Sequence, residues 1–341
     1  MIDTMIIFYP LSKWEYNDLF TGLNNMSCHM NGKKLYKDRN DKNAYVTHCL
    51  SKNGLQEIKL RYNKEKNYRA IEVRLRPKLL VDEGNYFDLI HLDEFDQARH
   101  AFNQIFTEFE YLPDMINWNT KRIDVAVDLE INEDNILNYM LVFKKCNIPS
   151  YMIQNKETTR FISSDHNLYL CSSNVTINIY SRYRVTRNKV NEGYLKNVNI
   201  EPTRNKLRVE IQYKICRGKL YRFLNRHFLC DIILRFFDAT IGPGDYYHLK
   251  DALKIIENDV RSIKKWILLR RLLILIHESG SIVNAKTIFL EKSANRTKAS
   301  KEFSYLIQNF RSMNINPVCI PDQLKIDKLD GIRNSIIQKF K

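Results

Sequence analysis

The chain has 341 residues, with 54 Lys and Arg against 39 Asp and Glu, and a formal net charge of +15. This length allows one large domain or two ordinary ones. The positive charge favours a negatively charged partner, either nucleic acid or an anionic membrane surface. A Lys-rich composition of the kind produced by AT-rich genomes would explain the charge alone. The longest apolar stretch, residues 266–276, is too short to span a bilayer and is interrupted by Arg270 and Arg271.

Cysteine usage and the first residues set expectations about the chain's environment. The seven cysteines form no CxxC pair and no Cys/His spacing of the zinc type, so we expect reduced, packed thiols. Residues 1–11 contain Asp3 and no basic segment ahead of an apolar run, unlike a secretory signal. We expect a cytoplasmic protein without a membrane partner. A basic membrane-surface protein is the weaker alternative, because there is no strongly amphipathic terminal helix and no lipidation motif.

Residues 1–215 mostly show the period-two alternation of half-buried strands. Strands are predicted at residues 5–8, 55–62, 68–76, 121–131, 167–171, 174–183 and 207–214. Helices are predicted among them at residues 92–112 and 135–146. Many strands with few helices indicate an α+β fold, here an antiparallel sheet with helices on one face.

The pattern changes to a period of 3.6 residues after residue 220, which is typical of helices. We therefore predict two domains, residues 1–220 and residues 221–341, the second mainly helical, with a linker within residues 215–245. In the second domain, helices are expected at residues 261–280, 282–293 and 301–313, with a polar turn at residues 294–300.

The last two of these helices, with their basic entry, fit a helix-turn-helix segment that binds DNA. Such a segment would hold duplex DNA mainly through phosphate contacts. The candidate DNA-binding residues of this half are Arg270, Arg271, Arg296, Lys298 and Lys301, with Asn295 at the front of the recognition helix. An ordinary helical bundle with a solvated basic face is the alternative.

Two segments carry a faint internal similarity. Residues 70–80 and residues 207–220 both place a Glu in mid-strand with basic residues after it. An internal duplication within residues 1–220 would explain this, and coincidence among basic strands would explain it equally well.

The segment KRIDVAVDLEI, residues 121–131, raises the question of why a strand carries carboxylates on its polar side. Asp is depleted in strands unless it is solvated, paired or bound to something. The same alternation places Glu72 and Glu210 on the polar sides of their own strands, so one sheet face would gather these acids with Asp124. Asp128 lies about 13 Å further along the strand and cannot share an ion with Asp124.

This gathering predicts a site for a hard divalent cation, Mg²⁺ or Mn²⁺, held by carboxylates from adjacent strands about 4.8 Å apart. Asp124, Glu210 and Glu72 are the candidate metal ligands. The alternative for each is a solvated or salt-bridged surface carboxylate.

The polar side of residues 174–183 carries Tyr180, followed by Arg182, Arg184 and Arg187. A phenol with a pKa near 10 becomes a useful nucleophile at neutral pH when a base, a cation or an arginine lies beside it. Tyr180 is the candidate nucleophile and Arg182 its candidate activator. A strand tyrosine that merely packs is the alternative, and Tyr183 is the competing nucleophile.

At these residues the sequence resembles a family. RIDVAVD with an acidic helix start after it, then NIYSRYRVTRNK, then LRVEIQYK, resemble in their order the core of Rep_trans-type plasmid replication initiators. The segments MIDTMIIFYPL and AIEVRLRPKLLVDEGNYF are similar to the gene II and X class of phage and plasmid replication proteins. The resemblance covers most of the chain.

The resemblance implies a rolling-circle initiator that nicks one strand of a double-stranded origin through a tyrosine–5′-phosphate link and later rejoins it. Tyr180 matches the nucleophile, Asp124 and Glu210 match acidic positions, and Glu72 matches an earlier acidic strand. Arg184 and Arg187 would contact DNA. The histidine pair of HUH relaxases is absent, which leaves the ligand set open.

The implied partners are the origin duplex and the nicked single strand, a host helicase and polymerase in a prokaryotic cytoplasm, and a second copy in a homodimer. The alternative function is a non-catalytic DNA-binding protein that acts in replication or plasmid control.

Overall fold

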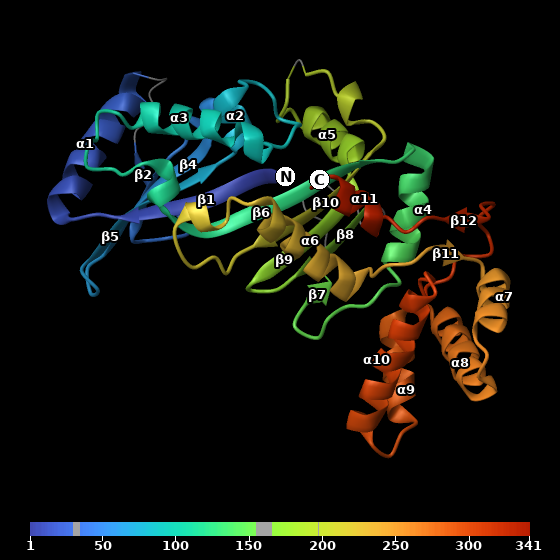
Figure 1. The fold of residues 1–341 in the computed structure, drawn as a ribbon. Helices are drawn as coiled ribbons and strands as arrows, with labels where there is room; N and C mark the ends of the chain where they lie inside the picture. The colour runs from blue at the N-terminus through green and yellow to red at the C-terminus, as the bar shows by residue number, and fades with distance from the viewer. Residues whose placement is uncertain (30–34, 155–165, 197) are drawn as a thin grey trace. The chain divides into compact units, whose positions relative to one another are not determined.

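In the computed structural model of the protein, the structure describes residues 1–29, 35–154, 166–196 and 198–341 (Figure 1). The chain divides into two compact units. The first contains residues 1–127, 173–175 and 210–232, and the second contains residues 128–172, 176–209 and 233–341. This division differs from the predicted boundary near residue 220, because strands β6 (Asn119–Glu130) and β10 (Lys206–Tyr213) each contribute residues to both units.

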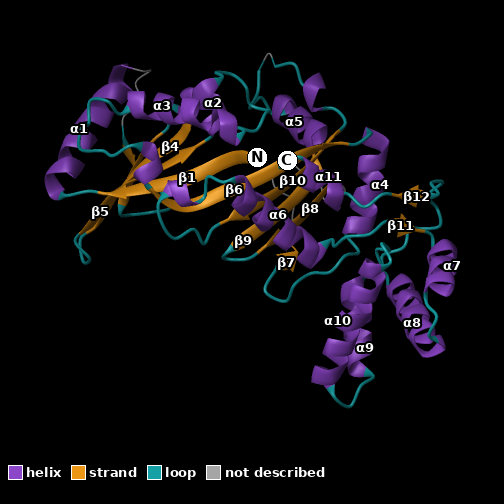
Figure 2. Cartoon of the chain, viewed as in Figure 1, coloured by secondary structure: helices purple, strands orange, loops and turns teal. Residues whose placement is uncertain are grey.

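The fold is α+β, with a large antiparallel sheet, as predicted (Figure 2). In the first unit the strands are hydrogen-bonded in the order β2-β3-β4-β5-β1-β6-β10. Their bounds are β1 Ile2–Pro10, β2 Tyr36–Lys37, β3 Ala44–Thr47, β4 Leu55–Asn63, β5 Tyr68–Leu75, β6 Asn119–Glu130 and β10 Lys206–Tyr213. The strands predicted in this unit are therefore confirmed, while β2 and β3 had not been predicted.

Three helices lie along one side of strands β1, β4 and β5 in Figure 1: α1 Lys13–His29, α2 Pro77–Val81 and α3 Phe95–Ile105. Alternate strand residues, among them Ile7, Leu60 and Ile71, are fully buried and form the core of this unit. The helix predicted at residues 92–112 is shorter than expected. It ends at Ile105 because the chain then turns to place the Phe106 ring 6.0 Å from that of Trp118.

In the second unit the strand order is β6-β10-β9-β8-β7. The new strands are β7 Ile153–Gln154, β8 Asn167–Cys171 and β9 Val175–Ser181. The strand predicted at residues 174–183 is wrong at its end, because helix α5, Arg182–Asn191, begins there. The Ser181 hydroxyl accepts a hydrogen bond from the Arg184 amide at 3.3 Å, and this N-cap ends the strand and starts the helix.

Residues 221–341, which were predicted to be mainly helical, contain α6 to α11 and two short strands. The helix predicted at residues 135–146 is α4, Glu133–Phe143. The later elements are α6 Arg226–Thr240, β11 Tyr246–Tyr247, α7 Leu249–Asp259, α8 Ile263–Ser279, α9 Ile282–Glu291, α10 Arg296–Ser312, β12 Lys328–Leu329 and α11 Arg333–Gln338. Within the described ranges, none of these helices has the length and apolar character needed to cross a membrane.

Helices α8, α9 and α10 contact one another and are joined by tight turns. Gly280 ends α8 in the left-handed conformation, with φ of 78°, and Ser281 caps α9 through its hydroxyl. The Asn295 side chain caps α10 by accepting a hydrogen bond from the Lys298 amide at 2.9 Å. The turn predicted at residues 294–300 is therefore shorter than expected, because this cap starts the helix at Arg296.

Candidate functional site

Strand register places the first group of candidate residues on one face of the sheet in the first unit. On β1, Phe8 is opposite Glu72 of β5, and Ile6 is opposite both Arg74 of β5 and Arg122 of β6. Paired residues of adjacent strands point to the same side. Glu72, Arg74 and Arg122 therefore share a face, and Asp124, two residues beyond Arg122, shares it too.

Asp124 is 1 % exposed and forms a bidentate pair with Arg122 on the same strand. The Arg122 Nε donates to Oδ1 and Nη2 donates to Oδ2, both at 2.6 Å. Burial raises the pKa of Asp124 to about 7, with the charges of Glu210 and Asp3 acting in the same direction and Arg122 opposing them. Near neutral pH this carboxyl is therefore divided between its charged and neutral forms.

Glu210 of β10 contributes the second carboxylate of this group. It is 6 % exposed, and the Gln212 side-chain amide donates to its Oε1 at 3.0 Å. Asp3 contributes the third, and its Oδ1 accepts from Arg76 Nη2 at 3.0 Å. We call Asp3, Asp124 and Glu210, with Arg122, the carboxylate cluster.

Glu72 is held by cations of its own. Arg61 donates to both of its carboxylate oxygens, at 3.1 and 3.2 Å, and Lys121 Nζ donates at 2.7 Å. Although burial opposes them, these hydrogen bonds lower the pKa of Glu72. Lys121 lies at a register shift between β1 and β6, a bulge that turns a side chain out of the regular alternation.

The three predicted metal ligands thus divide into a close pair and a separate residue. Asp124 and Glu210 act on each other electrostatically, whereas Glu72 has its own ion pairs. Across the part of the chain that the structure describes, no three His, Cys, Asp or Glu side chains form a group that could hold a metal ion.

Tyr180, in the second unit, is buried. Its side chain is 6 % exposed, and it forms a small apolar cluster with Val185 of α5. Every residue of β9 is buried, including Thr176 and Asn178 on the same side as Tyr180. In this structure the predicted nucleophile is therefore covered rather than presented to solvent.

Arg182 does not continue the strand, contrary to the prediction. It is the first residue of α5, is 5 % exposed, and lies close enough to Asp128 to lower the pKa of that acid. Asp128 also receives two hydrogen bonds from the fully buried Arg208, at 2.6 and 2.7 Å. Burial acts to raise the pKa of Asp128, but the pKa is lowered overall, and Arg208 makes the largest contribution to the lowering.

A further acid, Glu133, lies beside the end of β9. The Ser181 hydroxyl donates to its Oε1 at 3.0 Å, and Arg184 Nε lies 3.5 Å from the same oxygen. Its Oε2 is buried and has no hydrogen-bond partner among the described residues. In the sequence, Glu133 belongs to the acidic helix start that follows RIDVAVD. That pattern did not indicate that Glu133 would accept a hydrogen bond from Ser181.

Tyr183, the competing nucleophile, is more open than Tyr180. It lies in the first turn of α5 and is half-buried. Its hydroxyl accepts a hydrogen bond from Arg204 Nη2 at 3.0 Å, and the Arg204 guanidinium also lies 4.4 Å from the ring centroid.

The predicted DNA-binding residues of the second half lie on α8 and at the start of α10. Residues 263–312, which span α8 to α10, contain ten Lys and Arg against three Glu, a net formal charge of +7. No ion pair is present for these cations in the described part of the chain. The exposed ones are Lys264, Arg270, Arg271, Lys292, Arg296, Lys298 and Lys301. We use the name basic helical face for this set of seven residues on and between the three helices.

The two predicted DNA contacts on α5 differ from each other. Arg184 is exposed but engaged by Glu133, whereas Arg187 is exposed and forms no ion pair among the described residues. Arg187 can therefore bind an external anion directly. Arg184 could do so only after its ion pair with Glu133 is broken.

No family model, curated protein or solved structure matches this chain. The function must therefore be argued from the residues themselves.

Proposed function

We propose that this protein is a rolling-circle replication initiator, which binds a double-stranded origin and nicks one strand through a tyrosine–phosphate intermediate. The observation that carries the proposal is the basic helical face. Its seven exposed cations are divided between α8, α10 and the residue after α9, Lys292, and no acidic partner is present for them within the described ranges. Cations that are not neutralised within the protein are free to neutralise DNA phosphates and release counterions.

The contrast with the sheet strengthens this argument. On the sheet, Lys59, Arg61 and Arg208 each have a carboxylate within 3.1 Å, so their charge is largely compensated inside the protein. On the basic helical face it is not. The uncompensated positive charge of the basic helical face attracts a polyanion such as DNA and speeds its association with the protein. The α9-turn-α10 segment, with Arg296 and Lys298 at the start of α10, has the order of a helix-turn-helix.

The nicking part of the proposal is supported by the positions of the motifs that resemble the initiators. RIDVAVD, LRVEIQYK and NIYSRYR contribute to β6, β10 and β9, which are consecutive in the sheet. In the proposed step, the Tyr180 oxygen attacks the scissile phosphorus and forms an O–P bond. The bond from phosphorus to the 3′ oxygen breaks, and this oxygen leaves as a 3′ hydroxyl after taking a proton. The phenolic proton passes to a base or to water.

Because one phosphodiester replaces another, the step is reversible without ATP. The free 3′ hydroxyl would prime a host polymerase, and a host helicase would open the duplex. Arg182 would assist by countering charge on the phosphate. Either Tyr180 must become exposed when DNA binds, or the half-exposed Tyr183 serves in its place.

We further propose that Asp124 and Glu210 hold Mg²⁺ or Mn²⁺ during nicking. The donor set fits Mg²⁺ because this ion is usually bound by one or two carboxylates, with substrate phosphate and water as the other ligands. When bound, the ion would polarise the scissile phosphate. Arg122 holds Asp124 in the absence of the ion and would have to yield it, and Glu72 has no part in the set.

The test uses supercoiled DNA that carries the chain's own gene and its flanking sequence, because an initiator acts on the molecule that encodes it. With Mn²⁺, the wild type should convert it to nicked circles with protein attached. The Y180F variant should lose both products and bind DNA as the wild type does, while Y183F serves as the matched control. Loss of nicking in Y183F, with nicking retained in Y180F, would assign the chemistry to Tyr183.

A second function, a non-catalytic DNA-binding protein, is favoured by one observation. Tyr180 is covered, and both Asp124 and Glu72 are already engaged by cations. A protein of this kind would bind the same DNA and leave it intact with either metal. The two functions are separated by whether any nicked product appears at protein concentrations that saturate binding.

A further inference from the structure

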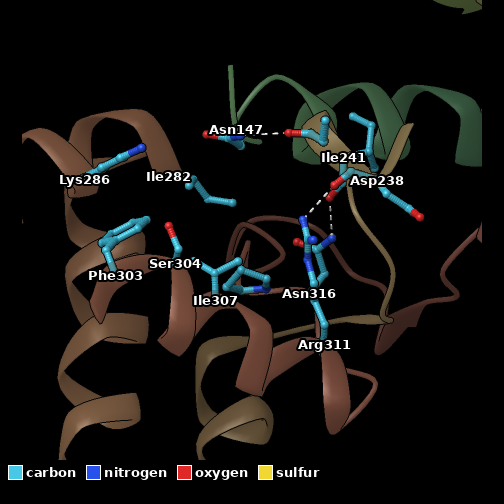
Figure 3. A pocket seen from close by; sticks show the side chains of 12 residues that line it. Asn147, Asp238, Ile241, Ile282, Lys286, Phe303, Ser304, Ile307, Arg311 and Asn316 are labelled. Atoms are coloured by element: carbon cyan, nitrogen blue, oxygen red, sulfur yellow. Dashed lines mark hydrogen bonds between the residues drawn. The ribbon is translucent and has the colours of Figure 1, made fainter. Parts of the chain in front are cut away.

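A cavity of about 210 Å³ lies in the second unit, and none of its lining residues belongs to the candidate sites described above (Figure 3). Its walls come from the end of α6, from α9 and α10, and from the segments that follow α4 and α10. The volume is several times that of one water molecule, so a small ligand group fits inside. The lining is partly apolar, from Ile282, Phe303 and Ile307. Its charged residues are Lys286, Arg311 and one acid, Asp238.

Arg311 has no carboxylate partner in the described part of the chain. Its one hydrogen bond is from Nη2 to the backbone carbonyl of Asp238, at 2.8 Å, in the last turn of α6. The guanidinium therefore interacts favourably with the negative end of the helix dipole. This contact uses one of the five N–H donors that a guanidinium carries. Burial lowers the pKa of Arg311, and the negative charge of Asp238 acts against this shift.

The nearest acid is already neutralised. Arg333 donates to both carboxylate oxygens of Asp238, with Nε at 2.8 Å from Oδ1 and Nη2 at 2.9 Å from Oδ2. The pair of Asp238 and Arg333 therefore carries no net charge. Arg311 and the half-buried Lys286 leave about two positive charges at the cavity, and Lys286 has no ion pair among the described residues either.

The Arg311 guanidinium lies close to the backbone at Gly242. Gly242 has φ of +77°, and a Cβ there would lie 2.8 Å from Arg311 Nη2. The positive φ favours glycine at this position. The amides of Asn147 and Asn316 donate to backbone carbonyls of Ala239 and Ile241, so they are structural and leave the two cations as the donors available to a ligand.

We infer that this cavity is a phosphate-binding site, with Arg311 as its fixed fork and Lys286 as its second cation. A phosphate monoester carries about −1.5 to −2 charges near neutral pH, which matches the two uncompensated cations. Arg binds phosphate oxygens in a bidentate manner, and Lys acts as a point charge. The apolar wall would cover the organic part of a phosphate ester.

The phosphate could belong to a free nucleotide or to the backbone of bound DNA, since Lys286 lies on α9 beside the basic helical face. The site does not depend on nicking, and in the free-nucleotide case it does not depend on DNA binding. Failure of the inference is therefore distinct from failure of the proposed function.

The experiment is isothermal titration calorimetry of the full chain with sodium phosphate and with deoxyadenosine 5′-monophosphate. The variants are R311Q, R311K and K286Q, and the control is K250Q, which removes an exposed lysine of α7 outside the cavity. We expect binding of the nucleotide, weakened at least tenfold in R311Q and K286Q, less in R311K, and unchanged in K250Q. Because Lys286 is half-buried on a helix surface, K286Q gives an answer even if R311Q fails to fold.

A second arm measures binding of a fluorescent DNA duplex against salt concentration. If the small ligands do not bind, but K286Q and R311Q each reduce the slope of log K against log salt by about one, the phosphate is that of DNA. If the small ligands do not bind and duplex binding by both variants matches the K250Q control, the inference is overturned.

Discussion

Arg122 donates two hydrogen bonds of 2.6 Å to the carboxylate of Asp124, its neighbour two residues along the same strand. Asp124 is buried and Arg122 is half-buried. The pKa of Asp124 is nevertheless raised, because the cost of burial and the charges of Glu210 and Asp3 outweigh one guanidinium. The carboxylate cluster thus keeps three acids together with Arg122 and with Arg76, which pairs with Asp3. Such a group is costly for folding, and it is suited to receiving a further positive charge.

The first prediction concerns stability against pH. The pKa of Asp124 rises from its ordinary value of 3.8 to about 7 on folding, so the folded state binds the proton more tightly. The resulting stability is fully present below pH 3.8 and is lost as the pH rises through about 7. Between pH 5 and pH 8 the wild type should lose about 2–4 kcal/mol more than D124N does. Urea unfolding at both pH values measures this, and equal losses in the two proteins would contradict it.

The second prediction concerns the buried pair of Asp128 and Arg208. D128A leaves Arg208, which is fully buried, without its carboxylate, and should lower the free energy of unfolding by about 3–5 kcal/mol. The double variant D128L/R208M, which removes both charges, should recover most of this loss. Denaturant unfolding measures both variants.

The control for that experiment is the exposed pair of Glu201 and Arg204, which form an ion pair at 2.8 Å. E201A should change stability very little, because water screens this pair. A D128A variant that is no less stable than E201A would show that Arg208 finds other compensation.

The third prediction concerns the basic helical face. The triple variant R296Q/K298Q/K301Q should weaken duplex binding and reduce the salt slope by up to about three. The matched control K52Q/K64Q/K66Q removes three exposed lysines of the first unit and should bind as the wild type does. Fluorescence anisotropy over a range of salt concentrations gives the slopes. If both triple variants lose the same affinity, binding depends on net charge and not on this face.

The sequence predicted strands well where one face is apolar and the other polar. β1, β4, β5, β6, β8 and β10 lie where alternation placed them. The end of β9 was missed because Ser181 acts as a helix cap, and a cap depends on the turn that follows as much as on its own residue type. Helix α1 was missed because it contains Gly22, where a Cβ would lie 2.5 Å from the ring of Phe109, a contact that is 87 residues distant in sequence and invisible locally.

The candidate site was predictable in part. Alternation identified the shared face of Glu72 and Asp124, because the side-chain period of a strand is fixed. It could not predict that Glu72 would bind Arg61 and Lys121, since the latter contact lies at a bulge. It also gave no sign that Tyr180 would be covered by Val185, because burial depends on where the next helix folds.

The most direct measurement of the central claim is to trap the intermediate and identify the modified residue. The protein is incubated with Mn²⁺ and a single-stranded oligonucleotide that bears a nick site. The oligonucleotide is taken from DNA that the protein cleaves or, in the absence of cleavage, from the flanks of its own gene. The adduct is then digested, and the modified peptide is sequenced by mass spectrometry. We predict a nucleotide-5′-phosphate on Tyr180. An adduct on Tyr183 would move the nucleophile to α5, and bound but unmodified protein would contradict the nicking function and leave a DNA-binding protein.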